Sequence, residues 1–165
     1  MCFWCSDGVG NAVRLVVAVV LCELAGVVGS VFTFPSIPTW YASLEKPSFN
    51  PPNWLFGPVW LILYGLMGVA VFFVWSKGLE SRGAKVALSV FVVQLFLNVL
   101  WSNVFFGLHS LFYGFVIIVA LWVSIALTIV VFARVSRTAS ALLLPYILWV
   151  SFASVLNYYI LLLNP

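Results

Sequence analysis

The chain has 165 residues, of which 65% are hydrophobic and 7% are charged, and its mean hydropathy is +1.21. Soluble domains carry about 25% charged residues, so this composition excludes an ordinary soluble domain and predicts a protein embedded in the lipid bilayer. The net charge of +3 rests on only seven basic residues, so we interpret it as a signal of membrane orientation and expect no nucleic-acid partner.

The N-terminal segment contains two of the three cysteines, in the run Cys2-Phe3-Trp4-Cys5. A single C-x-x-C pair lacks the second pair of ligands that a zinc site needs, and three cysteines do not form a disulfide framework. We therefore expect incidental thiols in this segment, with no metal site and no cofactor.

Five apolar stretches follow one another along the chain, and each is about 22 to 25 residues long. They cover residues 12–33, 54–76, 85–106, 111–133 and 139–163. At about 1.5 Å per residue, each can cross a hydrocarbon core of about 30 Å as an α-helix. Lipid offers no hydrogen bonds to an open backbone, so the sequence predicts an all-α membrane protein. We expect one domain over residues 1–165, a bundle of five transmembrane helices with an ordered loop at 34–53.

Basic side chains gather on one side of the predicted membrane. They lie in the N-terminal segment and in the second and fourth connections: Arg14, Lys77, Arg82, Lys85, Arg134 and Arg137. Lys46 and His109 fall on the other side. By the positive-inside rule, a prokaryotic protein of this pattern lies in the plasma membrane with its N-terminus in the cytoplasm and its C-terminus outside. In a eukaryote we expect the protein in the mitochondrial outer membrane, where the two sides of the membrane are no longer the cytoplasm and the cell exterior.

The first stretch carries small residues at four-residue steps, namely Ala18, Cys22, Gly26 and Ser30. Small residues at this spacing let two helix backbones approach closely, either within the chain or across a homodimer, and both arrangements stay open. Glu23 lies beside this stripe in the middle of the span, where an acid is costly. It indicates either a functional site or a protonated carboxyl that hydrogen-bonds to a neighbouring helix.

The loop before the second stretch is rich in proline and aromatic residues. Pro47, Pro51 and Pro52 fix their backbone angle φ and remove hydrogen-bond donors, so residues 47–53 cannot form a regular helix. The stiff aromatic side chains in and beside the loop are Trp40, Tyr41, Phe49, Trp54, Phe56 and Trp60. Such a segment at a membrane boundary is typical of a shaped cover rather than of a flexible tether.

Three of the predicted helices present aromatic and amide side chains on one face. By helical spacing these are Trp60 and Tyr64 on the second helix, Gln94, Asn98 and Trp101 on the third, and Tyr146, Trp149, Ala153 and Asn157 on the fifth. Amides in mid-membrane need partners, so this face either joins helices or forms the polar wall of a pocket. Flat aromatic walls with a few polar groups, closed by the segment 40–52, suit a large, planar and mostly apolar ligand. We also expect Pro145 to kink the fifth helix near its start.

Several of these runs resemble the translocator protein family (TspO/MBR, the peripheral benzodiazepine receptor family). The segment 40–60 matches its pattern W-Y-x-x-L-x-K-P, then P-P-x-W and G-P-x-W. Asn98-x-x-Trp101, followed by Phe-Phe-Gly, resembles the family's third-helix motif. Pro145-Tyr146-x-x-Trp149 begins a run that resembles its C-terminal motif.

This resemblance implies an integral membrane receptor or translocator that binds porphyrins, haem-type tetrapyrroles, and drugs of the benzodiazepine and isoquinoline types. It places in the ligand site Tyr41, Pro51, Trp60, Asn98, Trp149 and Ala153. The residue pattern adds Trp40, Tyr64, Trp101 and Tyr146. Some bacterial members are reported to degrade protoporphyrin in light, and Trp60 and Trp149 would be the catalytic residues if this chain did so. A structural or regulatory partner of other membrane proteins is the remaining alternative.

Two positions depart from the family pattern. Phe49 replaces a tryptophan, which keeps an aromatic side chain but removes an N–H donor. The sterol motif needs a Lys or Arg shortly after its tyrosine, and none follows Tyr158 or Tyr159, so we expect no cholesterol recognition of the animal type. His109 lies in a short turn without a partner residue, so we expect an exposed loop residue rather than a haem ligand.

Overall fold

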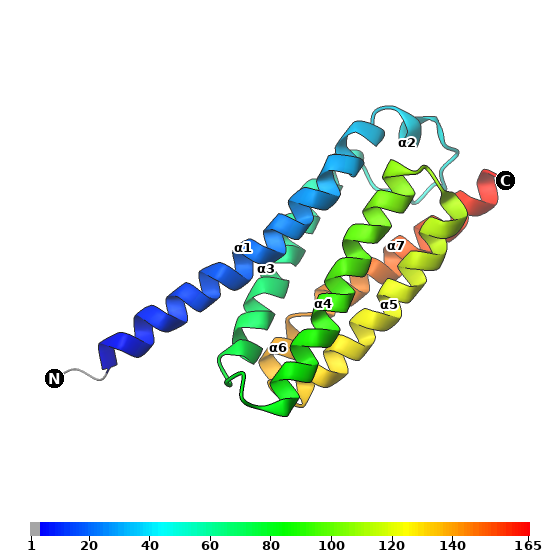
Figure 1. Cartoon of the computed structure of the whole chain (residues 1–165). Coiled ribbons are helices and arrows are strands. Elements are labelled where there is room, and N and C mark those ends of the chain that lie inside the picture. The colour runs from blue at the N-terminus through cyan, green and yellow to red at the C-terminus, as the bar shows by residue number, and fades with distance from the viewer. Residues whose placement is uncertain (1–3) are drawn as a thin grey trace.

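The computed structural model describes residues 4–165, with side chains from Gly10 onward, so the Cys2 and Cys5 thiols lie outside the described part. The regular elements of this range are helices (Figure 1). Five segments are long and apolar enough to cross a membrane: Gly10–Ser36, Asn53–Trp75, Arg82–Gly107, Leu111–Ala133 and Arg137–Leu163. The predicted all-α bundle of five transmembrane helices is confirmed.

The spans are built from helical elements that lie side by side. In chain order these are α1 (Trp4–Ser36), α2 (Trp40–Ser43), the 3₁₀ turn η1 (Asn53–Leu55), α3 (Phe56–Trp75), α4 (Arg82–Ser102), the π-helical turn η2 (Asn103–Gly107), α5 (Leu111–Ala133), α6 (Arg137–Ala141) and α7 (Leu144–Leu163). The helix α1 packs on α3 and α4, and α5 packs on both α4 and α7. The first turns of α1 extend beyond the ends of the other helices (Figure 1).

The small residues of α1 serve packing within the chain. Ala18 is buried, and a Cβ added at Gly26 would lie 2.6 Å from the Tyr64 ring of α3. From the other side, a Cβ added at Gly68 of α3 would lie 2.5 Å from the Val19 backbone. Glycines on both helices therefore let α1 and α3 approach closely, which is the intramolecular one of the two arrangements that the small-residue stripe allowed.

The fifth span is divided into two helices. The short α6 begins after Ser136, whose Oγ accepts a hydrogen bond from the Ala139 N–H at 3.3 Å, and α7 begins at Leu144. Pro145 lies in the first turn of α7, where a backbone N–H has no partner within the helix. The expected kink takes the form of a break: the span Arg137–Leu163 is interrupted between Ala141 and Leu144, and Pro145 lies directly after that break.

The segment between α1 and η1, residues 37–52, forms a lid over one end of the bundle (Figure 1). Asn164, just after α7, accepts a hydrogen bond from the Glu45 N–H at 3.0 Å and donates to the Glu45 carbonyl at 3.0 Å. Trp40 stacks on the exposed His109 ring, with 4.5 Å between the ring centroids. The lid is thus joined to the C-terminal end and to the turn between η2 and α5, so the loop is ordered as predicted.

Candidate ligand-binding site

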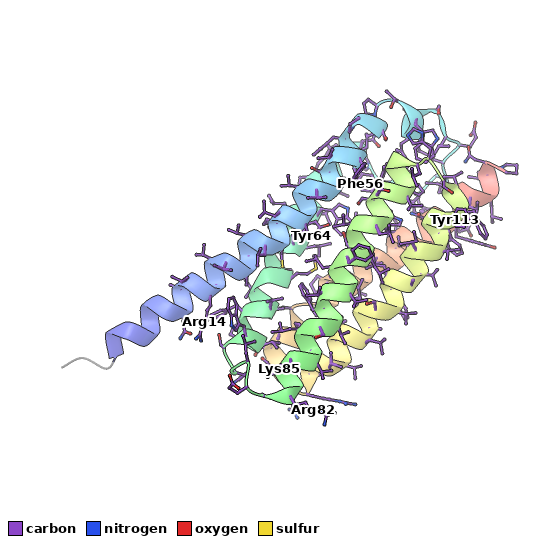
Figure 2. All side chains as sticks on the ribbon, viewed as in Figure 1. Arg14, Phe56, Tyr64, Arg82, Lys85 and Tyr113 are labelled. Carbon is purple, nitrogen blue, oxygen red and sulfur yellow. The ribbon has the colours of Figure 1, made fainter. Side chains whose placement is uncertain are left out.

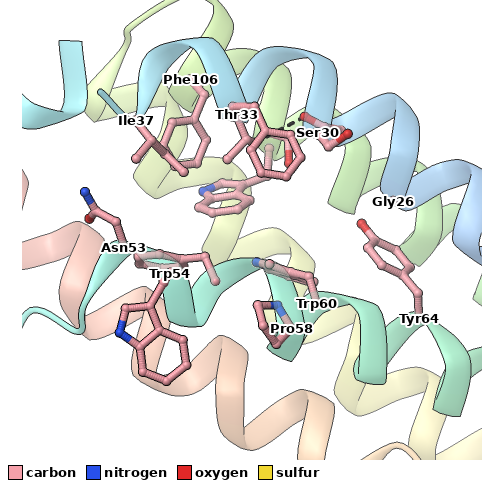
Figure 3. Close-up of a pocket in the computed structure, with 16 residues that line it drawn as sticks. Gly26, Ser30, Thr33, Ile37, Asn53, Trp54, Pro58, Trp60, Tyr64 and Phe106 are labelled. Atoms are coloured by element: carbon pink, nitrogen blue, oxygen red, sulfur yellow. Dashed lines mark hydrogen bonds between the residues drawn. The ribbon is translucent and has the colours of Figure 1, made fainter. Parts of the chain in front are cut away.

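A cavity of about 290 Å³ lies between α1 and α3, toward the lid, and α4 and η2 contribute its back (Figure 3). Its lining residues are mostly aromatic or small. They are Gly26, Gly29, Ser30, Thr33, Phe34, Ile37, Asn53, Trp54, Phe56, Gly57, Pro58, Trp60, Tyr64, Trp101, Ser102 and Phe106. The cavity is therefore apolar and flat-walled, with hydroxyl groups and one amide side chain at its edges.

Three aromatic rings form one wall of the cavity. The centroid of the Trp60 ring lies 5.6 Å from that of Tyr64 and 6.2 Å from that of Trp101. Trp101 stacks on Phe105 with 5.7 Å between centroids, and its indole N–H donates to Asn157 Oδ1 at 3.3 Å. Because neighbours on three helices hold these rings, the wall is formed before any ligand arrives.

The opposite wall comes from α1, whose residues there are small except for Phe34. Gly29 is buried, and a Cβ added to it would lie 3.1 Å from Ser102 Oγ on α4. Ser30 and Thr33 bond back to their own helix: Ser30 Oγ donates to the Val27 carbonyl at 2.7 Å, and Thr33 Oγ1 donates to the Gly29 carbonyl at 3.1 Å. Short side chains on α1 therefore leave room for a flat apolar molecule against the rings of α3 and α4. Few hydrogen-bond donors of α1 are free to face that molecule.

A chain of hydrogen-bonded polar side chains lies behind the aromatic wall. The Tyr64 hydroxyl donates to Asn98 Oδ1 at 2.5 Å, and Asn98 Nδ2 donates to the Tyr146 hydroxyl at 2.7 Å. Gln94 Nε2 donates to the same hydroxyl at 2.9 Å, while Gln94 Oε1 has no partner among the described residues. Unpaired polar groups are costly inside a bilayer, so this network joins α3, α4 and α7 and holds the Tyr64 ring in place.

A shallower groove of about 190 Å³ leads from the cavity to the outside of the bundle between α1 and α3. The two spaces share Gly26, Ser30, Phe34, Gly57, Trp60 and Tyr64. Glu23 lines the groove beyond these residues, and its Oε1 lies 3.5 Å from the place that a Cβ on Gly65 would take. The cavity is therefore continuous with the side of the bundle, and Glu23 stands at that opening.

The predicted site residues of the second and third spans lie close together. Trp60, Tyr64 and Trp101 line the cavity. Asn98 lies directly behind the wall, together with Tyr146 of the fifth span, in the hydrogen-bonded chain. These five residues form one unit, in which three side chains face the cavity and two support them.

The other predicted residues of α7 lie on a different side. Trp149 lines a separate groove of about 480 Å³ on the outer face of α3 and α7, and contacts Phe56 edge-on with 6.2 Å between centroids. Phe56 belongs to the cavity lining, whereas Trp149 does not. Ala153 is buried one turn further along α7. Trp60 and Trp149 therefore do not share one cavity in this structure.

The predicted lid residues pack above the site and do not line it. Trp40 contacts Phe105 at 5.4 Å between centroids, and Tyr41 contacts Phe106 at 5.8 Å. The Tyr41 hydroxyl donates to Asn50 Oδ1 at 2.7 Å, and burial raises the pKa of Tyr41 to about 12. Pro51 is half-buried in the lid. The lid thus reaches the cavity directly through Ile37 and indirectly through the rings of η2.

Sequence reasoning missed the part that α1 plays in the cavity. The spacing of Gly26 and Ser30 predicted only a surface for helix packing, and it assigned no role to Thr33. The run of small residues in α1 could have indicated this role. Where two helices pack closely at one small residue, the next small residue along the helix can leave a cavity between them. Phe106 was part of a noted motif, but its position could not be read from helical spacing because η2 changes the period of the helix.

Comparison with known proteins identifies the chain's relatives. The model of the TspO/MBR family matches residues 18–163. The chain is 49% identical over 151 residues to the Tryptophan-rich protein TspO of Chlorobaculum tepidum, covering 92% of this chain and 96% of that protein. It is 47% identical to the Tryptophan-rich protein TspO of Archaeoglobus fulgidus (93% and 99% covered) and 39% identical to the human Translocator protein (79% and 78% covered). The chain therefore belongs to the TspO/MBR family and is an integral membrane protein.

Proposed function

We propose that this protein is a membrane receptor or translocator that binds a porphyrin or haem-type tetrapyrrole in the cavity between α1 and α3. The observation that carries the proposal is the row of Trp60, Tyr64 and Trp101, which gives a flat aromatic wall facing the small residues of α1. Flat apolar ligands bind to such walls by stacking and by burial of apolar surface. Benzodiazepine-type and isoquinoline-type drugs are smaller, but they are also aromatic and mostly apolar, so the same wall would bind them.

The size of the site supports a plate-shaped ligand that enters edge-on. Ligand pockets are commonly about 300 to 1,000 Å³, and the cavity of about 290 Å³ lies just below that range. The groove of about 190 Å³ continues the same space toward the outside. A tetrapyrrole would therefore stack part of its face on Trp60 and Trp101 and leave the rest of its ring in the groove. In this arrangement Tyr41 and Pro51 belong to the lid, and Trp149 supports the cavity wall through its contact with Phe56.

The proposal is tested by titrating detergent-purified protein with protoporphyrin IX in the dark, following both tryptophan fluorescence and porphyrin absorbance. We expect saturable binding that Trp60→Phe weakens about fivefold, because a ring of the cavity wall loses contact area and its N–H. The matched control is Trp122→Phe, since Trp122 lies on α5, half exposed, and donates to Ser151 Oγ at 2.8 Å, away from the cavity. Unsaturable quenching that is the same in all three proteins would show that porphyrin only partitions into the micelle.

Light-dependent degradation of the bound porphyrin is the second candidate function. It is favoured by the position of the Trp60 indole within a row of rings, from which an excited porphyrin could take an electron, with dioxygen as the final oxidant. Illumination in air should then bleach the porphyrin with wild-type protein and not with Trp60→Phe. Trp149→Phe tests whether the tryptophan of the outer groove takes part.

The charge distribution supports a proposal for the orientation. Arg14, Arg82 and Lys85 lie at the end of the bundle opposite the lid (Figure 2). In a prokaryotic plasma membrane this end would face the cytoplasm, and the lid and the C-terminus would lie outside. In a eukaryote, the corresponding location would be the mitochondrial outer membrane.

A further inference from the structure

Another hollow, of about 510 Å³, lies at the opposite end of the bundle from the lid. Its lining residues come from the turn between α3 and α4, the start of α4 and the end of α5. They are Lys77, Ser81, Arg82, Gly83, Val86, Val131, Arg134 and Val135. None of them belongs to the cavity lined by Trp60, so this hollow is a separate feature of the molecule.

Three cations from three different elements face this hollow, and no acidic side chain is among its lining residues. Lys77 follows α3, Arg82 is the first residue of α4, and Arg134 ends α5. Glu80, the acid of the turn before α4, is not part of the lining. All three side chains are exposed and line one hollow, so an anion bound there would be attracted by each of them.

The backbone at the start of α4 adds donors to the same place. Ser81 precedes the helix, and its side chain makes no capping hydrogen bond. Gly83 lines the hollow with no side chain of its own; a Cβ there would lie 3.6 Å from Ser81 Oγ and 3.8 Å from Val135 Cγ2. The Ser81 hydroxyl and the first backbone N–H groups of α4 are therefore available beside the three cations.

The rest of the lining is apolar, and it points to an amphiphile rather than to a free anion. Val86 of α4, Val131 of α5 and Val135 form this part. The spans Arg82–Gly107 and Leu111–Ala133 begin and end at this level, so the cations lie at the membrane boundary and Val86 and Val131 lie on its membrane side. A phosphate group with acyl chains attached matches both parts of the hollow at once.

We propose that this hollow binds the head group of an anionic phospholipid, with its phosphate between Lys77, Arg82 and Arg134 and its acyl chains along the valines. A zwitterionic lipid should bind more weakly, because its own cation cancels the net negative charge of its phosphate. Bound lipid would tie together the turn before α4 and the end of α5, and so fix this end of the bundle in the leaflet that it occupies.

The test is native mass spectrometry of the detergent-purified full chain, titrated with phosphatidylglycerol and with phosphatidylcholine of the same acyl chains. The double variant Arg82→Gln/Arg134→Gln removes two cations from the hollow. The control Lys85→Gln/Arg137→Gln removes the same charge from the same end, at exposed residues outside the lining. We expect the dissociation constant for phosphatidylglycerol to rise about tenfold or more in the first variant and less than about twofold in the control.

Two results would overturn the proposal. Equal weakening in both variants would mean that the lipid responds only to the overall charge of this end. Displacement of phosphatidylglycerol by millimolar inorganic phosphate alone would mean that the site takes a free anion. Porphyrin titration of the same preparations shows whether each variant is folded, and its outcome does not depend on the lipid site.

Discussion

Glu23 is a carboxyl group in the middle of α1, yet it stands at the outer groove rather than inside the bundle. Acids within membrane spans usually face the interior and pair with a neighbouring group. The hydroxyl of Tyr64 on the facing helix donates to Asn98 and not to Glu23. A role in the folding of the bundle therefore explains this acid less well than a role at the opening of the cavity does.

Replacing Glu23 separates these two roles. We expect Glu23→Leu to raise the melting temperature in detergent, because the carboxyl faces the groove and receives no hydrogen bond from Tyr64, whereas a leucine suits the apolar surroundings of a membrane-spanning helix. Glu23→Gln should fall between the wild type and the leucine variant. Thermal unfolding and protoporphyrin titration on the same samples would show a gain in stability beside any loss of affinity. A lower melting temperature in Glu23→Leu would instead reveal a stabilising partner of the carboxyl.

At the scale of elements, the lid is held by polar contacts more than by its own regular structure. Its one helix, α2 (Trp40–Ser43), is a single turn without a side-chain cap. The order comes from the pairing of Asn164 with Glu45 and from the hydrogen bond of Tyr41 with Asn50. Lys46 Nζ adds a cation 5.1 Å above the Tyr41 ring and donates to the Leu44 carbonyl at 2.7 Å. The strength of such a polar contact changes with pH when one of its two partners gains or loses a proton.

The stabilisation of the lid by Tyr41 should be lost at high pH. Its pKa is about 12 in the folded protein and about 10 in an unfolded chain, so folding favours the protonated hydroxyl. The stabilisation is complete below a pH of about 10 and is lost as the pH rises through about 12, because a charged phenolate is costly to bury and can no longer donate to Asn50 Oδ1. We expect the difference in melting temperature between wild type and Tyr41→Phe to shrink from pH 9 to pH 12. A constant difference would show that the hydroxyl does not control the lid.

At the scale of the molecule, the five spans were predictable because membrane thickness fixes the length of an apolar helix. The grouping of Trp60, Tyr64, Asn98, Trp101 and Tyr146 was also predictable, since polar and aromatic side chains at helical spacing must turn inward in lipid. The rotation of α7 was not, and it places Trp149 on the outer groove. The rotation of α7 about its axis depends on the packing of many side chains from several helices at once. A single sequence motif does not determine it.

The role of α1 could not be predicted from the sequence either. A stripe of small residues has the same sequence whether it packs against a helix of its own chain or of another chain. In the structure the stripe is occupied: Gly26 meets Tyr64, and Gly29 meets Ser102. The same surface builds one wall of the cavity. Packing of the bundle and the shape of the site are therefore one feature of this molecule, and a homodimer through this stripe would have to displace α3.

A substitution at Gly26 distinguishes the two uses of the stripe. A Cβ there would already lie 2.6 Å from the Tyr64 ring, so we expect Gly26→Leu to force α1 away from α3, lower the melting temperature by several degrees and abolish saturable porphyrin binding together. Val31→Leu, on the exposed side of α1 at 64% exposure, is the matched control and should change neither property. Size-exclusion chromatography with light scattering completes the measurement. If Gly26→Leu kept its affinity for porphyrin and lost only an oligomer, the stripe would be a surface between chains, and the partner of α1 would be a second copy rather than α3.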